Sequence, residues 1–347
     1  MSWDVVGHEC AVDLLRRSLA SKRIGHAYLL SGPRGVGKRT LALAFARALN
    51  CETAGPGAGP SLSGVGDAAE PPCGACRRCR LIAEGKHPEV RVVGVQPPHK
   101  VIRVADVESI QADAALRPAD AFRKVYVIEG AELLHLDAAN RMLKTIEEPP
   151  PSVVIVLTTV DPEATLETIV SRCQHVRLRP LPADRLAHEM CTRGLAPERA
   201  QLLAALAEGA VGRALALAAD DAVLERRTRL LDDLDGLVGA NRVERLQYAR
   251  TLGDRWTSNP DAVREALGAW LRWWRDVLIL QRGTAARIVN LDRRGDLERH
   301  ASTFTPSVVA EAIARAQDTQ LMLDQNVNAR LALDVALLDL PRPARAA

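Results

Sequence analysis

The sequence predicts an α/β domain with a parallel sheet followed by helical domains, and three observations lead to this class. A short apolar run ending at Leu30 meets a glycine-rich segment, and the apolar helix pattern of 41–49 comes next. Two further apolar runs, 125–128 and 153–157, have the composition of buried parallel strands. After about Pro180 the strand pattern ends, and apolar residues recur at helical spacing.

The glycine-rich segment is a phosphate-binding loop with one altered position. Residues 31–40 read Ser-Gly-Pro-Arg-Gly-Val-Gly-Lys-Arg-Thr and supply the glycines and the lysine of G-x-x-x-x-G-K-[ST]. In such loops the backbone N–H groups hold phosphates, the lysine reaches the β/γ oxygens, and the hydroxyl ligates Mg²⁺. Arg39 stands where that hydroxyl is expected, and an arginine cannot ligate a cation. The predicted nucleotide-binding residues of this loop are Gly32, Gly35, Gly37, Lys38, Arg39 and Thr40.

The segment between the two later strands predicts a helix of the same domain. Asp137 can cap this helix, and Met142, Leu143 and Ile146 share one of its faces. Prolines 149–151 end it. Strands that alternate with helices predict a parallel sheet with helices on both faces. Residues 53–72 are rich in Gly, Pro, Ser and Ala without a period, which predicts a mobile insertion.

The rest of the chain predicts two helical parts. Residues 184–218 have the pattern of a small helical unit, and the remainder is helical to about Pro341. Trp270, Trp273 and Trp274 lie at helical spacing and are predicted to be core or subunit-contact residues. The predicted domains are an α/β domain over 1–179, a small helical domain over 180–219 and a larger helical domain over 220–347.

Composition and charge exclude several classes of protein. The chain has 347 residues, of which 47% are apolar, enough to bury more than one core. Its net charge of +3 is far from that of a dedicated nucleic-acid-binding protein. The N-terminus lacks a basic-then-apolar signal, and no stretch of about 18 apolar residues occurs. We therefore expect a cytoplasmic protein that does not contact a membrane.

Three closely spaced cysteines predict a metal site. The pattern is Cys73-x₂-Cys76-x₂-Cys79, and Cys51 or His87 is the candidate for the fourth ligand. A closed site of four thiolates holds structural Zn²⁺ in a reducing compartment. The odd total of seven cysteines argues against a disulfide framework. An iron–sulfur cluster is the alternative occupant, although this spacing departs from the usual cluster patterns.

Several motifs together resemble the clamp-loader subunits of bacterial DNA polymerase III. Besides the glycine loop and the cysteines, they are Val6-Gly7-His8, 25–30 (Gly-His-Ala-Tyr-Leu-Leu), 143–150 (Leu-Lys-Thr-Ile-Glu-Glu-Pro-Pro), Ser171-Arg172-Cys173 and 326–331 (Asn-Val-Asn-Ala-Arg-Leu). The resemblance implies an AAA+ module with a zinc-binding insertion over 51–79, a helical lid and a C-terminal collar domain. It also implies a hetero-pentameric ring with motor subunits and a delta subunit, which loads a sliding clamp onto primed DNA.

The family divides into motor subunits, which hydrolyse ATP, and the delta-prime type, which typically does not. Motor subunits carry Asp-Glu after the second apolar strand, where the aspartate helps hold Mg²⁺ and the glutamate activates water. Here Glu129 and Gly130 stand at these positions. Together with Arg39 they predict a delta-prime-type subunit. An ATP-hydrolysing motor subunit is the alternative, and a zinc-stabilised nucleic-acid-binding module is opposed by the low net charge.

The resemblance also implies roles for residues outside the loop. In these rings Ser-Arg-Cys presents an arginine to the nucleotide of the next subunit, and such an arginine is worth about 10³–10⁵ in rate. Arg172 is therefore the predicted catalytic residue, with a surface salt bridge as the alternative. Thr158 and Thr159 match the first sensor, and Arg213 matches the second. ATP or ADP bound without Mg²⁺ and an empty structural loop are both open for residues 31–40.

Overall fold

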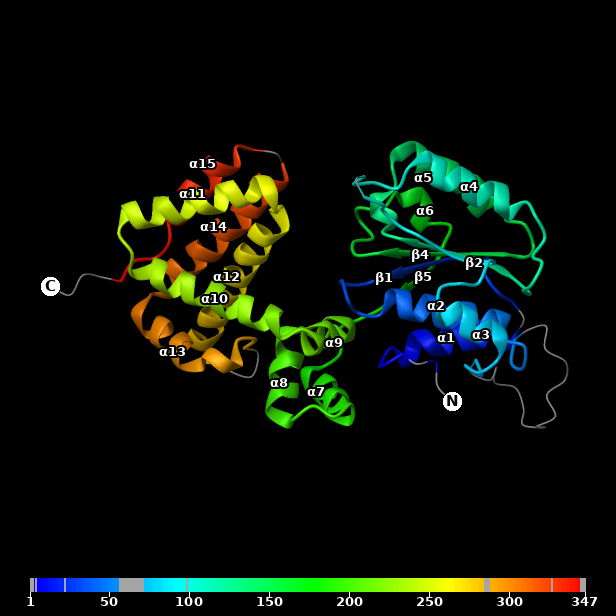
Figure 1. Ribbon diagram of the computed structural model, residues 1–347, viewed down its shortest axis with the longest axis horizontal. Coiled ribbons are helices and arrows are strands. Elements are labelled where there is room, and N and C mark those ends of the chain that lie inside the picture. The colour runs from blue at the N-terminus through cyan, green and yellow to red at the C-terminus, as the bar shows by residue number, and fades with distance from the viewer. Residues whose placement is uncertain are drawn as a thin grey trace. The chain divides into compact units, whose positions relative to one another are not determined.

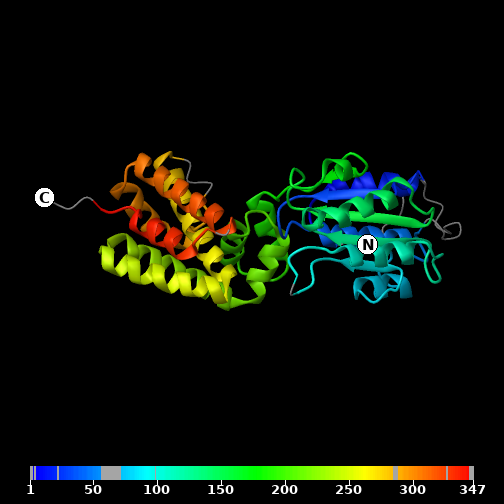
Figure 2. The same cartoon turned by 90° about the horizontal axis from the view of Figure 1, so that it is seen from above.

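The computed structural model describes residues 3, 5–21, 23–55, 72–97, 99–283, 288–325 and 327–343. The predicted mobile insertion lies, apart from 53–55 and Pro72, outside these residues. The chain forms two compact units, residues 1–182 with 209–213 and residues 183–208 with 214–347. They are drawn in blue to green and in green to red (Figures 1 and 2). Our division into three domains stays a prediction.

A five-stranded parallel sheet forms the first unit, in the order β2-β3-β4-β1-β5. The strands are β1 (Ala27–Ser31), β2 (Val90–Val93), β3 (Lys124–Glu129), β4 (Val153–Thr159) and β5 (Gln174–Arg177). The predicted strands correspond to β1, β3 and β4, which are almost entirely buried. Ser31 pairs with Thr159, and Glu129 pairs with Thr158, so the carboxyl ends of these three strands lie side by side. The predicted parallel α/β class is confirmed.

Helices cover both faces of this sheet because alternate strand residues face opposite sides. They are α1 (Glu9–Ala20), α2 (Lys38–Asn50), α3 (Arg77–Ala83), α4 (Val104–Ala114), η1 (Ala131–Leu133), α5 (Leu136–Glu147) and α6 (Glu167–Val170). One apolar core joins Tyr28 and Leu30 to α1 and α2, and the other joins Ala27 and Leu29 to α4, α5 and α6. Figure 1 shows α1, α2 and α3 on one side of the strands and α4, α5 and α6 on the other.

The predicted helix between β3 and β4 is confirmed as α5, but its predicted cap is wrong. Met142 and Ile146 are buried, as expected. The N-cap residue is His135, whose Nδ1 accepts a hydrogen bond from the backbone N–H of Asp137 at 3.4 Å. Asp137 lies inside the first turn instead, where its negative charge still favours the helix N-terminus.

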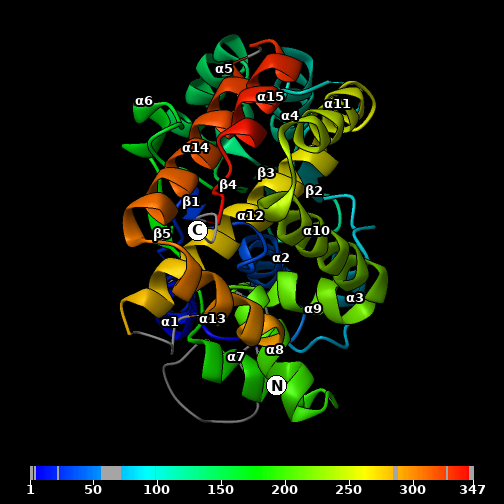
Figure 3. The ribbon, with the colours of Figure 1, turned by 90° about the vertical axis from the view of Figure 1, so that its left-hand side faces the viewer.

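The second unit is helical, as predicted for this part of the chain. It contains α7 (Ala183–Thr192), α8 (Pro197–Leu206), α10 (Asp221–Gly239), α11 (Arg242–Ser258), α12 (Pro260–Gln281), η3 (Leu291–Arg293), α13 (Arg294–Thr303), α14 (Pro306–Asp324) and α15 (Ala329–Leu338). Helix α9 (Val211–Ala219) begins in the first unit and ends in the second. In Figure 3 helices α10 to α15 are turned towards the viewer. Among the described residues no helix is long and apolar enough to cross a membrane.

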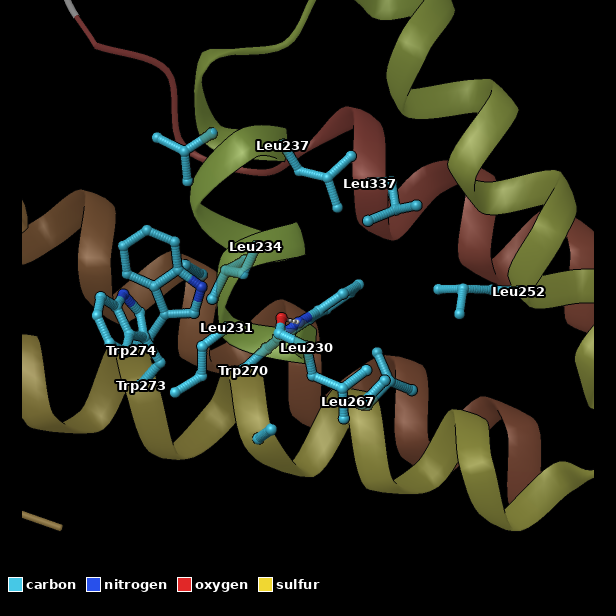
Figure 4. Close-up of a cluster of buried hydrophobic side chains, with 14 of the residues drawn as sticks. Leu230, Leu231, Leu234, Leu237, Leu252, Leu267, Trp270, Trp273, Trp274 and Leu337 are labelled. Carbon is cyan, nitrogen blue, oxygen red and sulfur yellow. Dashed lines mark hydrogen bonds between the residues drawn. The ribbon is translucent and has the colours of Figure 1, made fainter. Parts of the chain in front are cut away.

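The three tryptophans of α12 belong to the core of this unit, as predicted (Figure 4). Trp270 donates its indole N–H to the carbonyl oxygen of Leu230 at 3.0 Å. Trp273 donates to Nδ1 of His300, also at 3.0 Å, and Trp274 stacks on the same imidazole. Buried indole N–H groups need such acceptors, so these contacts fix how α12 packs against α10 and α13.

Candidate functional site

The glycine loop connects β1 to α2 and places Lys38 at the start of the helix. Gly32 cannot be replaced by a larger residue, because a Cβ there would lie 2.5 Å from the carbonyl oxygen of Leu178. Gly37 is the N-cap of α2 and has a φ of +113°, a conformation that favours glycine. Strand, loop and helix therefore have the arrangement that a phosphate-binding loop requires.

A cavity of about 340 Å³ lies beside this loop. It is lined by Arg34, Gly35, Gly37, Lys38, Arg39, Thr40, Glu129, Gly130, Glu132, Leu133, Thr158, Val160 and Gly212. The ammonium of Lys38 donates to the carbonyl oxygens of Gly32 and Pro33, the latter at 2.9 Å. Burial lowers the pKa of Lys38 from its ordinary value. The lysine is therefore bound to its own loop at the edge of the cavity.

The two altered motif positions contact each other. Nη1 of Arg39 donates to Oε2 of Glu129 at 3.1 Å, although the two residues are 90 positions apart in the chain. Arg39 comes from the first turn of α2, and Glu129 ends β3. Their side chains are 58% and 33% exposed, so the guanidinium lies at the open side of the cavity. Glu129, at the position where the sequence predicts a metal-binding carboxylate, is thus paired with a cation of the protein.

Residue 130, where the resemblance implies a glutamate in motor subunits, is a glycine and has no carboxylate. Gly130 has a φ of +84°, and a Cβ there would lie 2.8 Å from Cδ1 of Leu133. The leucine therefore occupies the space next to residue 130. Glu132 also lines the cavity, and its Oε1 accepts the backbone N–H of Val160 at 3.3 Å. This carboxylate is held on the loop after β4.

Of the three residues assigned to the two sensors, Thr158 lines the cavity, whereas Thr159 and Arg213 do not. Thr158 lines the cavity, and its Oγ1 accepts the backbone N–H of Gly130 at 3.3 Å. Thr159 is fully buried, does not line the cavity, and donates to the carbonyl oxygen of Asp161 at 2.8 Å. Arg213 does not line the cavity either, but its neighbour Gly212 does. Gly212 donates its N–H to the carbonyl oxygen of Gly35 at 2.8 Å, which fixes the start of α9 on the loop.

Arg172 lies in the turn between α6 and β5, away from this cavity. Its Nη1 donates to the carbonyl oxygen of Thr168 at 3.1 Å, and its Nε lies 2.6 Å from Oε1 of Glu147. Gln174, which begins β5, pairs with Tyr28 near the start of β1. The glycine loop leaves the other end of β1, and strands rise about 3.3 Å per residue. Arg172 therefore lies at the amino ends of the parallel strands, whereas the cavity lies at their carboxyl ends.

Four cysteines form a second candidate site in this unit. The sulfur atoms of Cys51, Cys73, Cys76 and Cys79 all lie within 4.8 Å of one another. Backbone N–H groups donate to three of the sulfurs at 3.3–3.4 Å. His87 is outside this group, and its Nδ1 accepts the N–H of Glu89 at 3.2 Å. Four converging thiols fit a tetrahedral Zn²⁺, and the structure brings Cys51 rather than His87 to them.

Comparisons with known proteins agree with this architecture. Residues 7–182 match the family described as "DNA polymerase III, delta subunit", and residues 256–341 match "DNA polymerase III, delta subunit, C terminal". The chain belongs to this family of clamp-loader subunits. It is 29% identical to DNA polymerase III subunit delta' of Bacillus subtilis (strain 168), over 91% of this chain and 90% of that protein.

Further relatives include tau subunits of DNA polymerase III. The clamp-loader subunit is 36% identical to DNA polymerase III subunit tau of Escherichia coli (strain K12), over 62% of this chain and 32% of that protein. Among solved structures, a gamma subunit-related protein of Thermotoga maritima aligns with a TM-score of 0.39 and 16% identity. That alignment covers 94% of this chain and 98% of the other.

The clamp-loader subunit thus brings together most of the residues predicted for a nucleotide site. Gly32, Thr159 and Arg213 are near the cavity but do not line it. The sequence motifs do not indicate roles for Glu132 and Glu147. Glu132 follows Glu129 by three residues, and Glu147 belongs to the motif of 143–150. Both could have been found as carboxylates close to motif positions, but their partners come from other segments.

Proposed function

We propose that this clamp-loader subunit is of the delta-prime type and supplies Arg172 in trans to the ATP site of a neighbouring motor subunit. The observation that carries the proposal is the position of Arg172 at the amino ends of the strands, whereas the cavity of the same subunit lies at their carboxyl ends. From there the guanidinium cannot contact a nucleotide bound to its own loop. Its side chain is 41% exposed and can contact a phosphate presented by another subunit.

The proposed subunit does not hydrolyse ATP itself. Hydrolysis of this type needs a metal held near the γ-phosphate and a carboxylate that orients water. Arg39 replaces the hydroxyl ligand, and Gly130 has no side chain with which to orient water. Leu133 occupies the adjacent space, which supports the loss of that function. Thr158, which lines the cavity, is the better candidate for the first sensor.

The proposed partners are the other subunits of the loader. The relatives are named as delta' and tau subunits of DNA polymerase III, which supports a ring of motor subunits, a delta subunit and this chain. We propose that the C-terminal helices dock in the collar of this hetero-pentamer. The ring would pass an opened sliding clamp to primed DNA, which this subunit contacts only indirectly, in agreement with its net charge of +3.

The proposed cofactor is one structural Zn²⁺ held by the four cysteines. Cys51 follows the last residue of α2, and Cys76 and Cys79 belong to the start of α3. A metal there would fasten α3 to the end of α2. With all four positions taken by thiolates, the site would have no open position for a substrate.

The experiment that tests the trans role is ATP turnover by the reconstituted loader in the presence of clamp and primed DNA. We expect Arg172→Ala to lower turnover by about 10³-fold or more at the site it serves, and Lys38→Ala to leave turnover nearly unchanged. Arg193→Ala is the matched control, because Arg193 is similarly exposed and forms an ion pair with Glu189. A larger loss in Lys38→Ala than in Arg172→Ala would mean that this subunit hydrolyses ATP itself.

A further inference from the structure

The cavity does not fit the Mg²⁺ that normally accompanies a nucleotide in such loops. A guanidinium has N–H donors and no acceptor, so Arg39 cannot ligate a metal. It also holds the carboxylate of Glu129 at 3.1 Å, the other group expected near the metal. A divalent cation placed there would lie close to the positive charge of Arg39, and like charges repel.

The same arrangement suits a phosphate chain without a metal. Three cations, Arg34, Lys38 and Arg39, and two carboxylates, Glu129 and Glu132, line the cavity. The lining is therefore net positive before any ligand binds. A guanidinium matches the geometry of phosphate oxygens, and its contact with Glu129 uses only one of its nitrogens.

Thr40 has a hydroxyl and lines the cavity as well. It follows Arg39 on α2, where each residue turns the helix by about 100°, so it does not stand in the usual ligand position. The hydroxyl of Thr40 is the only one from this helix turn that a metal could use instead of the missing ligand. A variant at this position therefore belongs in the test.

We propose that the cavity binds a nucleoside triphosphate without Mg²⁺ and that Arg39, oriented by Glu129, supplies the positive charge in place of the metal. The inference deepens the proposed function and rests on the loss of hydrolysis in this subunit. Bound nucleotide would then remain intact, because the site lacks both the metal and the water-orienting carboxylate. It would act as a ligand that binds the loop reversibly and is not hydrolysed there.

The test is a calorimetric titration of the purified full chain with ATP, once in EDTA and once in excess Mg²⁺. We expect binding in EDTA, binding weakened about tenfold by Mg²⁺ because the metal competes for the phosphates, and no binding by Lys38→Ala. Arg39→Thr restores the hydroxyl ligand and should reverse the dependence, with tighter binding in Mg²⁺. Arg117→Thr is the control, since Arg117 is exposed and does not line the cavity.

Three results would overturn the inference. They are the absence of ATP binding by the unchanged chain in both buffers, tighter binding in Mg²⁺ that Thr40→Val abolishes, and the same Mg²⁺ dependence in Arg39→Thr as in the unchanged chain. Arg39 is 58% exposed, so its replacement should leave the melting temperature unchanged. None of these results bears on Arg172, whose role is measured on the nucleotide of another subunit.

Discussion

Nε of Arg172 lies 2.6 Å from a carboxylate oxygen of Glu147, and the two side chains are 41% and 46% exposed. Glu147 is the last residue of α5, whereas Arg172 follows α6. An ion pair this exposed contributes only about 0–1 kcal/mol to stability. In the proposed trans role, Glu147 can therefore orient the guanidinium and still release it to a phosphate without a large cost in free energy. We regard it as a positioning residue for Arg172.

Replacement of Glu147 by glutamine should lower the ATP turnover of the reconstituted loader less than Arg172→Ala does. Glutamine keeps the size of the side chain but loses the charge that orients Arg172, so we expect a loss of about three- to tenfold at the site that Arg172 serves. Steady-state kinetics should place the loss in kcat rather than in KM. Glu148→Gln is the matched control, because Glu148 is also exposed and adjacent. Equal effects of the two variants would refute the positioning role.

A side chain at residue 130 should destabilise the first unit without creating an ATPase. Gly130 has a φ of +84°, and a Cβ would lie 2.8 Å from Leu133, so Gly130→Ala and Gly130→Glu should each lower the free energy of unfolding by about 1–3 kcal/mol. Gly130→Glu should show no turnover, since Arg39 still replaces the metal ligand. Urea denaturation and an ATPase assay of the isolated chain measure both effects.

The control for this prediction separates backbone strain from the clash. Gly85 has a φ of +68° with open space around its Cβ position, so Gly85→Ala introduces the strain alone. Its loss of stability should be smaller than that of Gly130→Ala. Leu133→Ala in the Gly130→Ala background should recover the difference. If the double variant is no more stable than Gly130→Ala, the contact with Leu133 is not the cause.

Metal analysis should give one zinc per chain, and Cys51→Ser should remove it. Three remaining thiolates bind Zn²⁺ much more weakly than four, and the binding energy of a structural site contributes to folding. We therefore expect a lower melting temperature in Cys51→Ser and after chelation. His87→Ala should keep its zinc, as should Cys10→Ser, which replaces an exposed cysteine outside the group. Full zinc content in Cys51→Ser would contradict the four-cysteine site.

The sequence could predict the strands and the loop because their signals are local. The apolar runs that become β3 and β4 and the glycines of the loop each reside in a few consecutive residues. The pairing of Arg39 with Glu129 joins two segments 90 residues apart, and it depends on where β3 ends relative to α2. No pattern in the chain encodes that distance.

At two places local rules leave two candidate residues one or two positions apart. Asp137 and His135 can both cap a helix, and the backbone selects His135, whose ring reaches the N–H of residue 137. Thr158 and Thr159 are adjacent in β4, so they point to opposite faces. Only Thr158 points to the cavity, which depends on the register of β4 with β3.

Arg245 should be essential for the stability of the second unit although it has no role in the proposed chemistry. Its guanidinium is fully buried and donates to backbone carbonyls at the end of α10 and after α15. The shortest of these contacts are with Leu237 at 2.9 Å, Val238 at 2.9 Å, Leu340 at 2.6 Å and Pro341 at 3.0 Å. Carbonyls at helix C-termini lack helical partners, so one side chain satisfies the ends of two segments.

Arg245→Met keeps much of the volume but leaves these carbonyls without a donor. Each unsatisfied buried group costs about 1–3 kcal/mol, and we expect a total loss of about 3–5 kcal/mol in the free energy of unfolding. Arg245→Lys should lose less, because one ammonium can donate to some of the same oxygens. Urea titration monitored by tryptophan fluorescence reports mainly this unit, since four of the five tryptophans, Trp256, Trp270, Trp273 and Trp274, belong to it. Arg242→Met, an exposed arginine one turn earlier on α11, should change little, and a comparable loss there would show that the buried guanidinium is not responsible.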